Sequence, residues 1–227
     1  MWEAEPIIPT KKRLKPDPRA LSHEELIKLI QRAFLLSEPE GQRVVVFTGG
    51  QKGSGCSSIL VGVGQILAAQ TDRGVCLVDA NVENPALHLC FGVENLNGLT
   101  SALAEDRPLS NYLQRLRGGN LWLLPCGSNI SRLHATLTAE KFQLRLAELR
   151  REFAYVLVDA PPVDGRADAV ILGRLADGVV LVLEANVTRR EVARIAKETF
   201  EAAQVRLLGA VLNKRTFPVP AWIYNRL

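Results

Sequence analysis

The sequence predicts a doubly wound α/β fold with a mostly parallel sheet, and three observations lead to that prediction. Several segments are continuous apolar runs, which is the composition of strands covered by helices on both faces. Segments with apolar residues at helical spacing stand between these runs, and such alternation is typical of parallel sheets. The length of 227 residues, with 47% apolar and 23% charged residues, suits one large domain and excludes a fibrous or mostly disordered chain.

The expected elements follow one another in a regular order. Ser22 and Glu25 form a capping box at the start of a helix predicted over residues 22–37. Strands are predicted over residues 43–48, 75–79, 120–125, 155–159, 179–183 and 206–212. Helices are predicted over residues 59–67, 99–104, 109–116 and 142–153, and another is capped by Thr188 and Glu191.

The two ends of the chain differ from this pattern. Residues 1–21 are expected to be a flexible, basic, Pro-rich tail, residues 22–216 the domain, and residues 217–227 a C-terminal tail. The first tail is either a solvated leader or a docking arm for an acidic protein or lipid surface. The net charge of +4 includes no basic stripe that indicates nucleic-acid binding.

Targeting signals and cysteine pairs are not evident in the sequence. No apolar run predicts a membrane span, and the N-terminal residues do not resemble a signal peptide. The four cysteines form no CxxC pair, so neither a zinc site nor a disulfide framework is indicated. We therefore expect a cytoplasmic protein with reduced thiols.

A glycine-rich loop at residues 49–58 joins the first predicted strand to a helix. Gly50 and Gly55 have the spacing of the phosphate-binding motif G-x-x-x-x-G-K-[ST], and Ser57 takes the place of its magnesium-binding hydroxyl. Cys56 replaces the lysine of the motif. A thiol cannot donate the charge-assisted hydrogen bonds of lysine, each worth about 1.5–3 kcal/mol. The alternatives are a turn without a ligand and a reactive Cys56 with a lowered pKa at a helix N-terminus.

Three motifs in this order resemble those of the bacterial tyrosine autokinases (BY-kinases) of capsule and exopolysaccharide assembly, which are relatives of the MinD/ParA ATPases. They are the loop just described, Leu-Val-Asp-Ala-Asn-Val-Glu-Asn-Pro at residues 77–85, and Val-Leu-Val-Asp-Ala-Pro-Pro at residues 156–162. The resemblance covers about residues 22–215 and implies a P-loop NTPase fold with ATP and Mg²⁺ as cofactors.

The resemblance also implies roles for individual residues. Asp79 and Asp159 would be catalytic, and together with Ser57 they would hold the metal. The phosphate-binding residues would be Gly50, Lys52, Gly53, Ser54, Gly55, Cys56, Ser57 and Ser58. Asn213 would contact the purine, and because Lys214, Arg215 and Thr216 follow it in place of the N-K-x-D pattern of GTP binders, adenine is favoured.

The sequence departs from the family pattern at positions where the chemistry is expected. Besides Cys56, a second acid of the family is replaced by Asn81, and a basic residue is replaced by Glu83. The C-terminal tyrosine cluster is reduced to Tyr224. In the first helix, the two arginines of the family's oligomerisation motif become Lys28 and Gln31.

These departures favour a regulator with weak or absent phosphoryl transfer in exopolysaccharide or capsule synthesis. Such a regulator would lie in the cytoplasm at the inner membrane, bound to a membrane polysaccharide co-polymerase or an active BY-kinase homologue, as a homo- or hetero-oligomer. ATP and Mg²⁺ binding would be weakened or lost. One alternative is an active autokinase in which Lys52 replaces the missing lysine and Tyr224 accepts the phosphate. The other is a MinD/ParA-type positioning ATPase.

Overall fold

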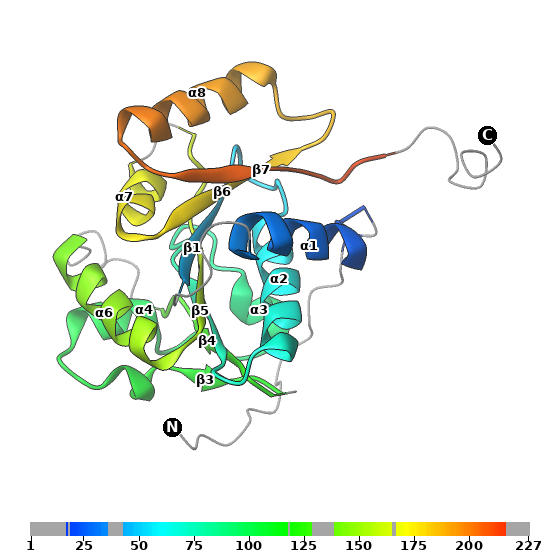
Figure 1. The fold of residues 1–227 in the computed structure, drawn as a ribbon. Helices are drawn as coiled ribbons and strands as arrows, with labels where there is room; N and C mark the ends of the chain where they lie inside the picture. The colour runs from blue at the N-terminus through cyan, green and yellow to red at the C-terminus, as the bar shows by residue number, and fades with distance from the viewer. Residues whose placement is uncertain are drawn as a thin grey trace.

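A computed structural model describes residues 17, 19–35, 43–117, 119–128, 139–164 and 167–216, and its centre is a twisted sheet (Figure 1). Within these residues seven strands pair in the order β3-β4-β2-β5-β1-β6-β7. The parallel strands are β1 (Arg43–Gly49), β2 (Val75–Asp79), β4 (Leu121–Leu124), β5 (Tyr155–Asp159), β6 (Gly178–Glu184) and β7 (Leu207–Asn213). A short edge strand, β3 (Gln114–Arg115), is antiparallel to β4. The predicted fold class is confirmed.

Both faces of the sheet are covered, which explains the continuous apolar runs in the sequence. In β1 the side chains of Val44 and Val46 pack into one hydrophobic core, while Val45 and Phe47 pack into the other. All four are nearly or fully buried. A strand with two buried faces requires apolar residues at consecutive positions, in contrast to the alternation of a strand with one solvated face.

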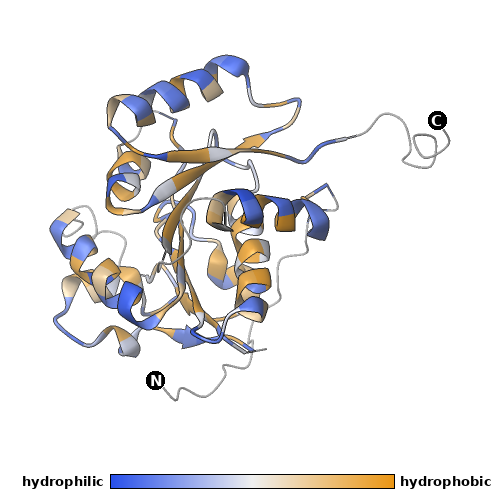
Figure 2. Cartoon of the chain, in the orientation of Figure 1, coloured by the Kyte–Doolittle hydropathy of each residue, from blue (hydrophilic) through white to orange (hydrophobic). Residues whose placement is uncertain are grey.

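The helices form a layer on each side of the sheet (Figure 1). One layer contains α1 (His23–Ile30), which continues as a π-helical segment (Gln31–Leu35), α2 (Cys56–Gln70) and α3 (Leu87–Phe91). The other contains α4 (Leu99–Ala104), α6 (Ala139–Glu152), α7 (Asp168–Leu175) and α8 (Arg190–Ala202). Figure 2 shows the strands as mostly apolar and the outer side of α8 as polar. This amphipathic pattern places Ala196 and Phe200 of α8 in the core.

The predicted start of the first helix is confirmed in detail. The Ser22 side chain accepts a hydrogen bond from the Glu25 N–H at 3.3 Å, and the Glu25 carboxylate accepts one from the Ser22 N–H at 2.9 Å. The helical path extends to Leu35, whereas residues 36 and 37 of the predicted helix lie outside the described residues. The predicted strands agree with the observed ones within two residues at each end.

Two local predictions are wrong. A helix over residues 109–116 was expected, but a 3₁₀ turn (Leu109–Asn111) leads into β3, because the backbone pairs with β4 through Gln114 and Arg115. Thr188 does not cap α8. Its hydroxyl instead accepts a hydrogen bond from the Glu184 N–H at 2.9 Å, and α8 begins after Arg189 without a side-chain cap.

The longest apolar helix in the described residues is α2, which has 15 residues. No helix in this part of the chain is both long and apolar enough to cross a bilayer.

Candidate functional site

A pocket of about 380 Å³ lies at the carboxyl ends of the parallel strands. Its walls are the loop between β1 and α2, the loop after β2, the residues that follow β5, and the end of β7. The turn before α1 contributes Asp17 and Ala20. The carboxyl ends of parallel strands are where ligands bind in open α/β sheets, because the connecting loops gather there.

The loop between β1 and α2 has the geometry of an anion-binding site. Gly53 and Gly55 have φ values of 86° and 85°, which are readily accessible to glycine, and both line the pocket. Such glycines allow successive peptide N–H groups to turn toward one point. Gly55 also precedes the first turn of the 15-residue helix α2, whose N-terminus carries a partial positive charge. Gly55 lies against the Asn213 side-chain amide, so a larger residue would not fit there.

Most of the predicted phosphate-binding residues line this pocket, and one does not. Gly53, Ser54, Gly55, Cys56, Ser57, Ser58 and Lys52 are all part of the lining. The Gly50 N–H instead donates to the Val182 carbonyl of β6 at 2.9 Å, and a side chain at Gly50 would meet Leu183. Gly50 therefore extends the pairing of β1 with β6. Among the described residues, it is not part of the pocket lining.

Ser57 and Asp159 meet at the bottom of the loop. The Ser57 hydroxyl donates to Asp159 Oδ2 at 2.5 Å. Asp159 is fully buried, and burial raises the pKa of its carboxyl group to about 6 in spite of the hydrogen bond from Ser57. Asp159 Oδ1 has no hydrogen-bond partner within the described residues. A buried carboxylate oxygen without a partner is a group that a ligand or ion would satisfy.

Asp79 lies beside Asp159, but its carboxylate binds the backbone of the loop after β2. The two carboxylates occupy paired positions on β2 and β5. Asp79 accepts hydrogen bonds from the backbone N–H groups of Ala86 and Leu87, both at 3.0 Å, and from Asn81 at 3.3 Å. Burial, and then the charge of Asp159, raise the pKa of Asp79 to about 8. The hydrogen bonds of Asp79 therefore stabilise the loop after β2. Among the described residues, Asp79 is not part of the pocket lining.

Cys56 stands where the loop motif has lysine. It is the first residue of α2, and it lines the pocket beside Ser57, the residue that donates to Asp159. Burial and the negative charge of Asp159 raise the pKa of Cys56 well above its usual value. The thiol is thus neutral at physiological pH, and the alternative of a reactive Cys56 with a lowered pKa is wrong.

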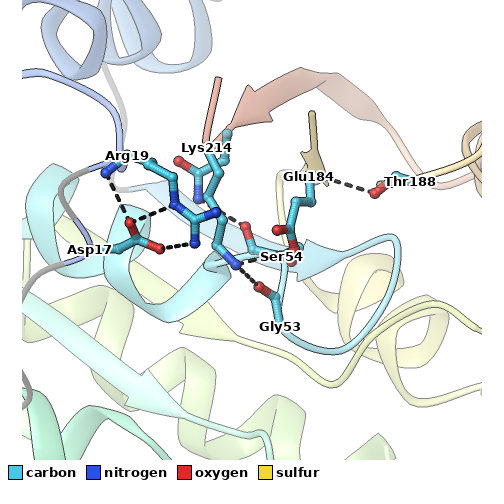
Figure 3. A network of polar contacts seen from close by, with 8 residues as sticks. Asp17, Arg19, Gly53, Ser54, Glu184, Thr188 and Lys214 are labelled. Atoms are coloured by element: carbon cyan, nitrogen blue, oxygen red, sulfur yellow. Dashed lines mark hydrogen bonds and ion pairs between the residues drawn. The ribbon is translucent and has the colours of Figure 1, made fainter. Parts of the chain in front are cut away.

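The end of β7 contacts the loop through two neighbouring side chains (Figure 3). The Asn213 amide donates to the Ser54 carbonyl at 2.8 Å. Lys214 Nζ donates to the Gly53 carbonyl at 2.5 Å and lies 3.1 Å from Glu184 Oε2. Sequence reasoning identified Asn213 and missed the contacts of Lys214 and Glu184. The available signal was a basic residue directly after the asparagine at the end of the last strand.

The remaining positions at which the sequence departs from the family fall in different environments. Asn81 lines the pocket, whereas Glu83 is exposed. Lys28 of α1 pairs with Glu24 on the surface. Tyr224 lies outside the described residues.

These residues suit a magnesium–nucleotide complex better than a metal alone. The peptide N–H groups of the loop and the N-terminus of α2 suit phosphate oxygens. The Ser57 hydroxyl and the unpartnered oxygen of Asp159 are the hard oxygen donors that Mg²⁺ prefers. In the described part of the chain there is no group of three or more His, Cys, Asp or Glu residues that could hold a metal by itself. Fold and site together define a P-loop protein with the α/β fold of the MinD/ParA type.

Comparison with known proteins places the chain more narrowly. The family model for the cellulose biosynthesis protein BcsQ matches residues 42–208. The tyrosine-protein kinase YwqD of Bacillus subtilis is 32% identical over 198 residues, which are 87% of this chain and 83% of the relative. A tyrosine-protein kinase CpsD of Streptococcus agalactiae is 27% identical over 197 residues, 86% of this chain and 85% of the relative. The chain belongs to the family of BY-kinase-like P-loop proteins.

Solved structures agree with this assignment. The kinase domain of VpsO has a TM-score of 0.73 at 27% identity and covers 85% of this chain and 95% of its own. The kinase domain of the Escherichia coli tyrosine kinase ETK has a TM-score of 0.77 at 23% identity, with 88% and 79% covered. MinD of Pyrococcus horikoshii, solved with Mg-ADP, has a TM-score of 0.62 at 20% identity, with 75% and 69% covered. The last two likenesses concern the fold alone.

Proposed function

We propose that this protein is a nucleotide-binding regulator of bacterial exopolysaccharide or capsule synthesis in which phosphoryl transfer is weak or absent. The family supports the setting, since its relatives are named tyrosine-protein kinases and its matching model a cellulose biosynthesis protein. The observation that carries the loss of transfer is the neutral, partly buried thiol of Cys56 at the position of the loop lysine.

In this proposal the ligand is Mg-ATP, held by residues that line or underlie the pocket. Loop amides would bind the phosphates, and Ser57 with Asp159 would hold the metal, which neutralises phosphate charge when bound. Asp79 does not line the pocket, so it would influence the metal only indirectly, through the charge of the neighbouring Asp159. Asn213 Nδ2 is committed to the Ser54 carbonyl, whereas Asn213 Oδ1 is buried without a partner in the described region. An acceptor at this place favours the amino group of adenine over the carbonyl oxygen of guanine.

Phosphoryl transfer needs more than binding, because negative charge must be stabilised as it redistributes in the transition state. Removing one such stabilising donor costs about 10²–10³ in rate. The Cys56 thiol has no positive charge, because its raised pKa keeps it neutral. Asn81, which lines the pocket in place of an acid, cannot act as a base. Both replacements weaken catalysis while leaving the amide cradle intact.

The binding half of the proposal is tested by calorimetric titration with Mg-ATP. We expect the wild-type protein to bind, and Cys56→Lys to bind about tenfold more tightly, since one charge-assisted hydrogen bond is restored. Cys90→Ser is the matched control, because Cys90 also lines the pocket but lies outside the loop. Failure of the wild-type protein to bind Mg-ATP contradicts the proposal.

The partner is proposed from the family resemblance together with α1. A membrane polysaccharide co-polymerase or an active BY-kinase homologue would bind α1 and the preceding tail, and would hold the protein in the cytoplasm at the inner membrane. Co-purification of the protein with such a partner, and its loss on exchanging the exposed Lys28 and Gln31 of this helical segment for glutamate, tests this arrangement.

An active tyrosine autokinase is the second candidate, because Lys52 lines the pocket and could supply a cation. It requires phosphate on Tyr224 after incubation with Mg-ATP. A MinD/ParA-type positioning ATPase is the third candidate, supported by the fold shared with MinD. It requires ATP-dependent dimerisation together with binding to lipid or DNA, and a monomer indifferent to nucleotide contradicts it.

A further inference from the structure

The pocket contains a positively charged side chain that comes from the far end of the described chain. Lys214 follows the last residue of β7 and lines the pocket beside Gly53 and Gly55 of the loop. Its Cε atom lies 3.7 Å from the position that a Cβ at Gly55 would occupy. The side chain therefore lies along the glycine-rich loop, and Figure 3 shows its ammonium group at the Gly53 carbonyl.

Lys214 is held in place by two acceptors and by an unusual backbone. Its φ is 55°, a value that costs a non-glycine residue free energy and persists only where surrounding contacts enforce it. The Gly53 carbonyl and the Glu184 carboxylate accept hydrogen bonds from its ammonium group. The Lys214 and Glu184 side chains are only 15% and 14% exposed.

Glu184 is itself fixed by the turn after β6. Its N–H donates to the Thr188 hydroxyl, and the Ala185 N–H donates to the Asn213 carbonyl at 2.9 Å. The carboxylate thus comes from the end of β6, where the backbone is tied to the following turn and to the end of β7. A charge held on rigid supports is pre-organised for a ligand, because little rotamer entropy remains to be lost on binding.

We propose that Lys214 is the cation that this pocket presents to an anionic ligand, in place of the lysine missing at position 56. The inference rests on the proposed function. A lysine ammonium has three N–H groups, and the contacts among the described residues use two of them, at Gly53 and Glu184. The third is left for a phosphate oxygen. Lys52, the alternative cation, also lines the pocket, but its side chain is exposed to solvent.

Asp17 opposes the ligand in this arrangement. It lines the pocket, and it forms an ion pair with Arg19 at 3.0 Å within the turn that leads into α1 (Figure 3). Arg19 first, and Lys214 to a smaller extent, lower the pKa of Asp17, so this carboxylate is ionised and close to the ammonium group. An incoming phosphate carries the same charge as Asp17 and would compete with it for Lys214. Removing the Asp17 charge should therefore tighten binding.

The test compares calorimetric affinities for Mg-ATP and for uncharged adenosine. Lys214→Gln should weaken Mg-ATP binding by about tenfold or more, Lys214→Arg should restore most of it, and adenosine binding should change by less than about threefold. Lys52→Gln should weaken Mg-ATP binding by a smaller factor than Lys214→Gln, because the Lys52 side chain is exposed to solvent. Asp17→Asn should tighten Mg-ATP binding by about two- to fivefold, whereas the control Asp72→Asn, at an exposed site away from the pocket, should not.

Three results would overturn the inference. If Lys52→Gln abolishes binding while Lys214→Gln does not, another cation serves the pocket and the proposed function still stands. If Lys214→Gln weakens Mg-ATP and adenosine equally, Lys214 only braces the loop. If the wild-type protein binds no Mg-ATP, the proposed function fails together with the inference. If Lys214→Gln does not fold, Asp17→Asn still tests the inference, because Asp17 lies in a surface turn outside the core. Weaker or unchanged Mg-ATP binding in Asp17→Asn contradicts the competition between Asp17 and phosphate for Lys214.

Discussion

Replacing Asp159 by asparagine should stabilise the folded protein at neutral pH. The carboxylate is fully buried, one of its oxygens has no partner in the described part of the chain, and burial raises its pKa from 3.8 to about 6. A raised carboxyl pKa means that the folded state holds the proton more tightly than the unfolded state. The resulting stability is therefore fully present below about pH 4 and is lost as the pH rises through about 6.

The size of the effect follows from the shift. A difference of about two pKa units corresponds to about 3 kcal/mol of free energy of unfolding lost at neutral pH. Asparagine removes the charge and keeps an acceptor for the Ser57 hydroxyl, but its amide N–H groups then need acceptors, which costs about 1–2 kcal/mol. We expect a net gain of about 1–2 kcal/mol near pH 8. Loss of the neighbouring charge should also lower the pKa of Asp79 from about 8.

Urea unfolding of wild type and Asp159→Asn at about pH 4.5 and about pH 8 measures this difference. The variant should be more stable at the higher pH, and its advantage should disappear at the lower one, where the carboxyl group of the wild-type protein is protonated. Asp72→Asn, which removes an exposed charge, serves as the control. A variant that is less stable than wild type at the higher pH, or a difference that does not change with pH, would refute the reasoning.

Three further changes test the contacts around the site. Asn213→Ala removes the 2.8 Å hydrogen bond to the Ser54 carbonyl, so the free energy of unfolding should fall by about 1–2 kcal/mol and Mg-ATP affinity should fall with it; unchanged values for both would show that the contact does not hold the loop. Gly64→Ala places a Cβ 2.6 Å from Leu77 Cδ2 in the core, so the free energy of unfolding, measured by thermal unfolding, should fall by about 1–3 kcal/mol. Gly62→Ala, whose Cβ meets the partly buried Leu26, is the matched control and should lower it by less. Equal losses in the two variants would contradict this packing. Cys56 should react with iodoacetamide more slowly at neutral pH than a free thiol does, because burial and the charge of Asp159 raise its pKa; rapid alkylation, located by peptide mapping, would disprove the neutral thiol.

The strand and helix positions were predictable wherever local pattern and tertiary burial agree. In β5 every residue after Tyr155 is buried, so the apolar run marks the strand without ambiguity. The segment around Leu113 and Leu116 was not predictable, because apolar residues at helical spacing there are buried by pairing with β4 and not by a helix face. The hydroxyl of Thr188 could either cap α8 or accept a hydrogen bond from the preceding turn. The path of the turn after β6 selects the second, with the Glu184 N–H as donor.

The site was predictable where its residues are close in sequence. The loop motif brings Cys56 and Ser57 to one end of α2, and the strand pattern places Asp159 at the same edge. The places of Lys214 and Asp17 in the pocket lining could not be predicted, because these residues come from the two ends of the described chain and carry no motif of their own. The occupation of Asp79 by three backbone N–H groups was equally hidden, since it depends on the path of the loop after β2.

The most direct test of whether Cys56 has removed phosphoryl transfer is phosphate release and phosphotyrosine formation with Mg-ATP, measured by a coupled assay and by mass spectrometry. The wild-type protein should transfer phosphate no faster than a Ser57→Ala/Asp159→Asn double variant, and carry no phosphate on Tyr224. Transfer by the wild-type protein well above that of the double variant would contradict the central claim and identify a working kinase or ATPase.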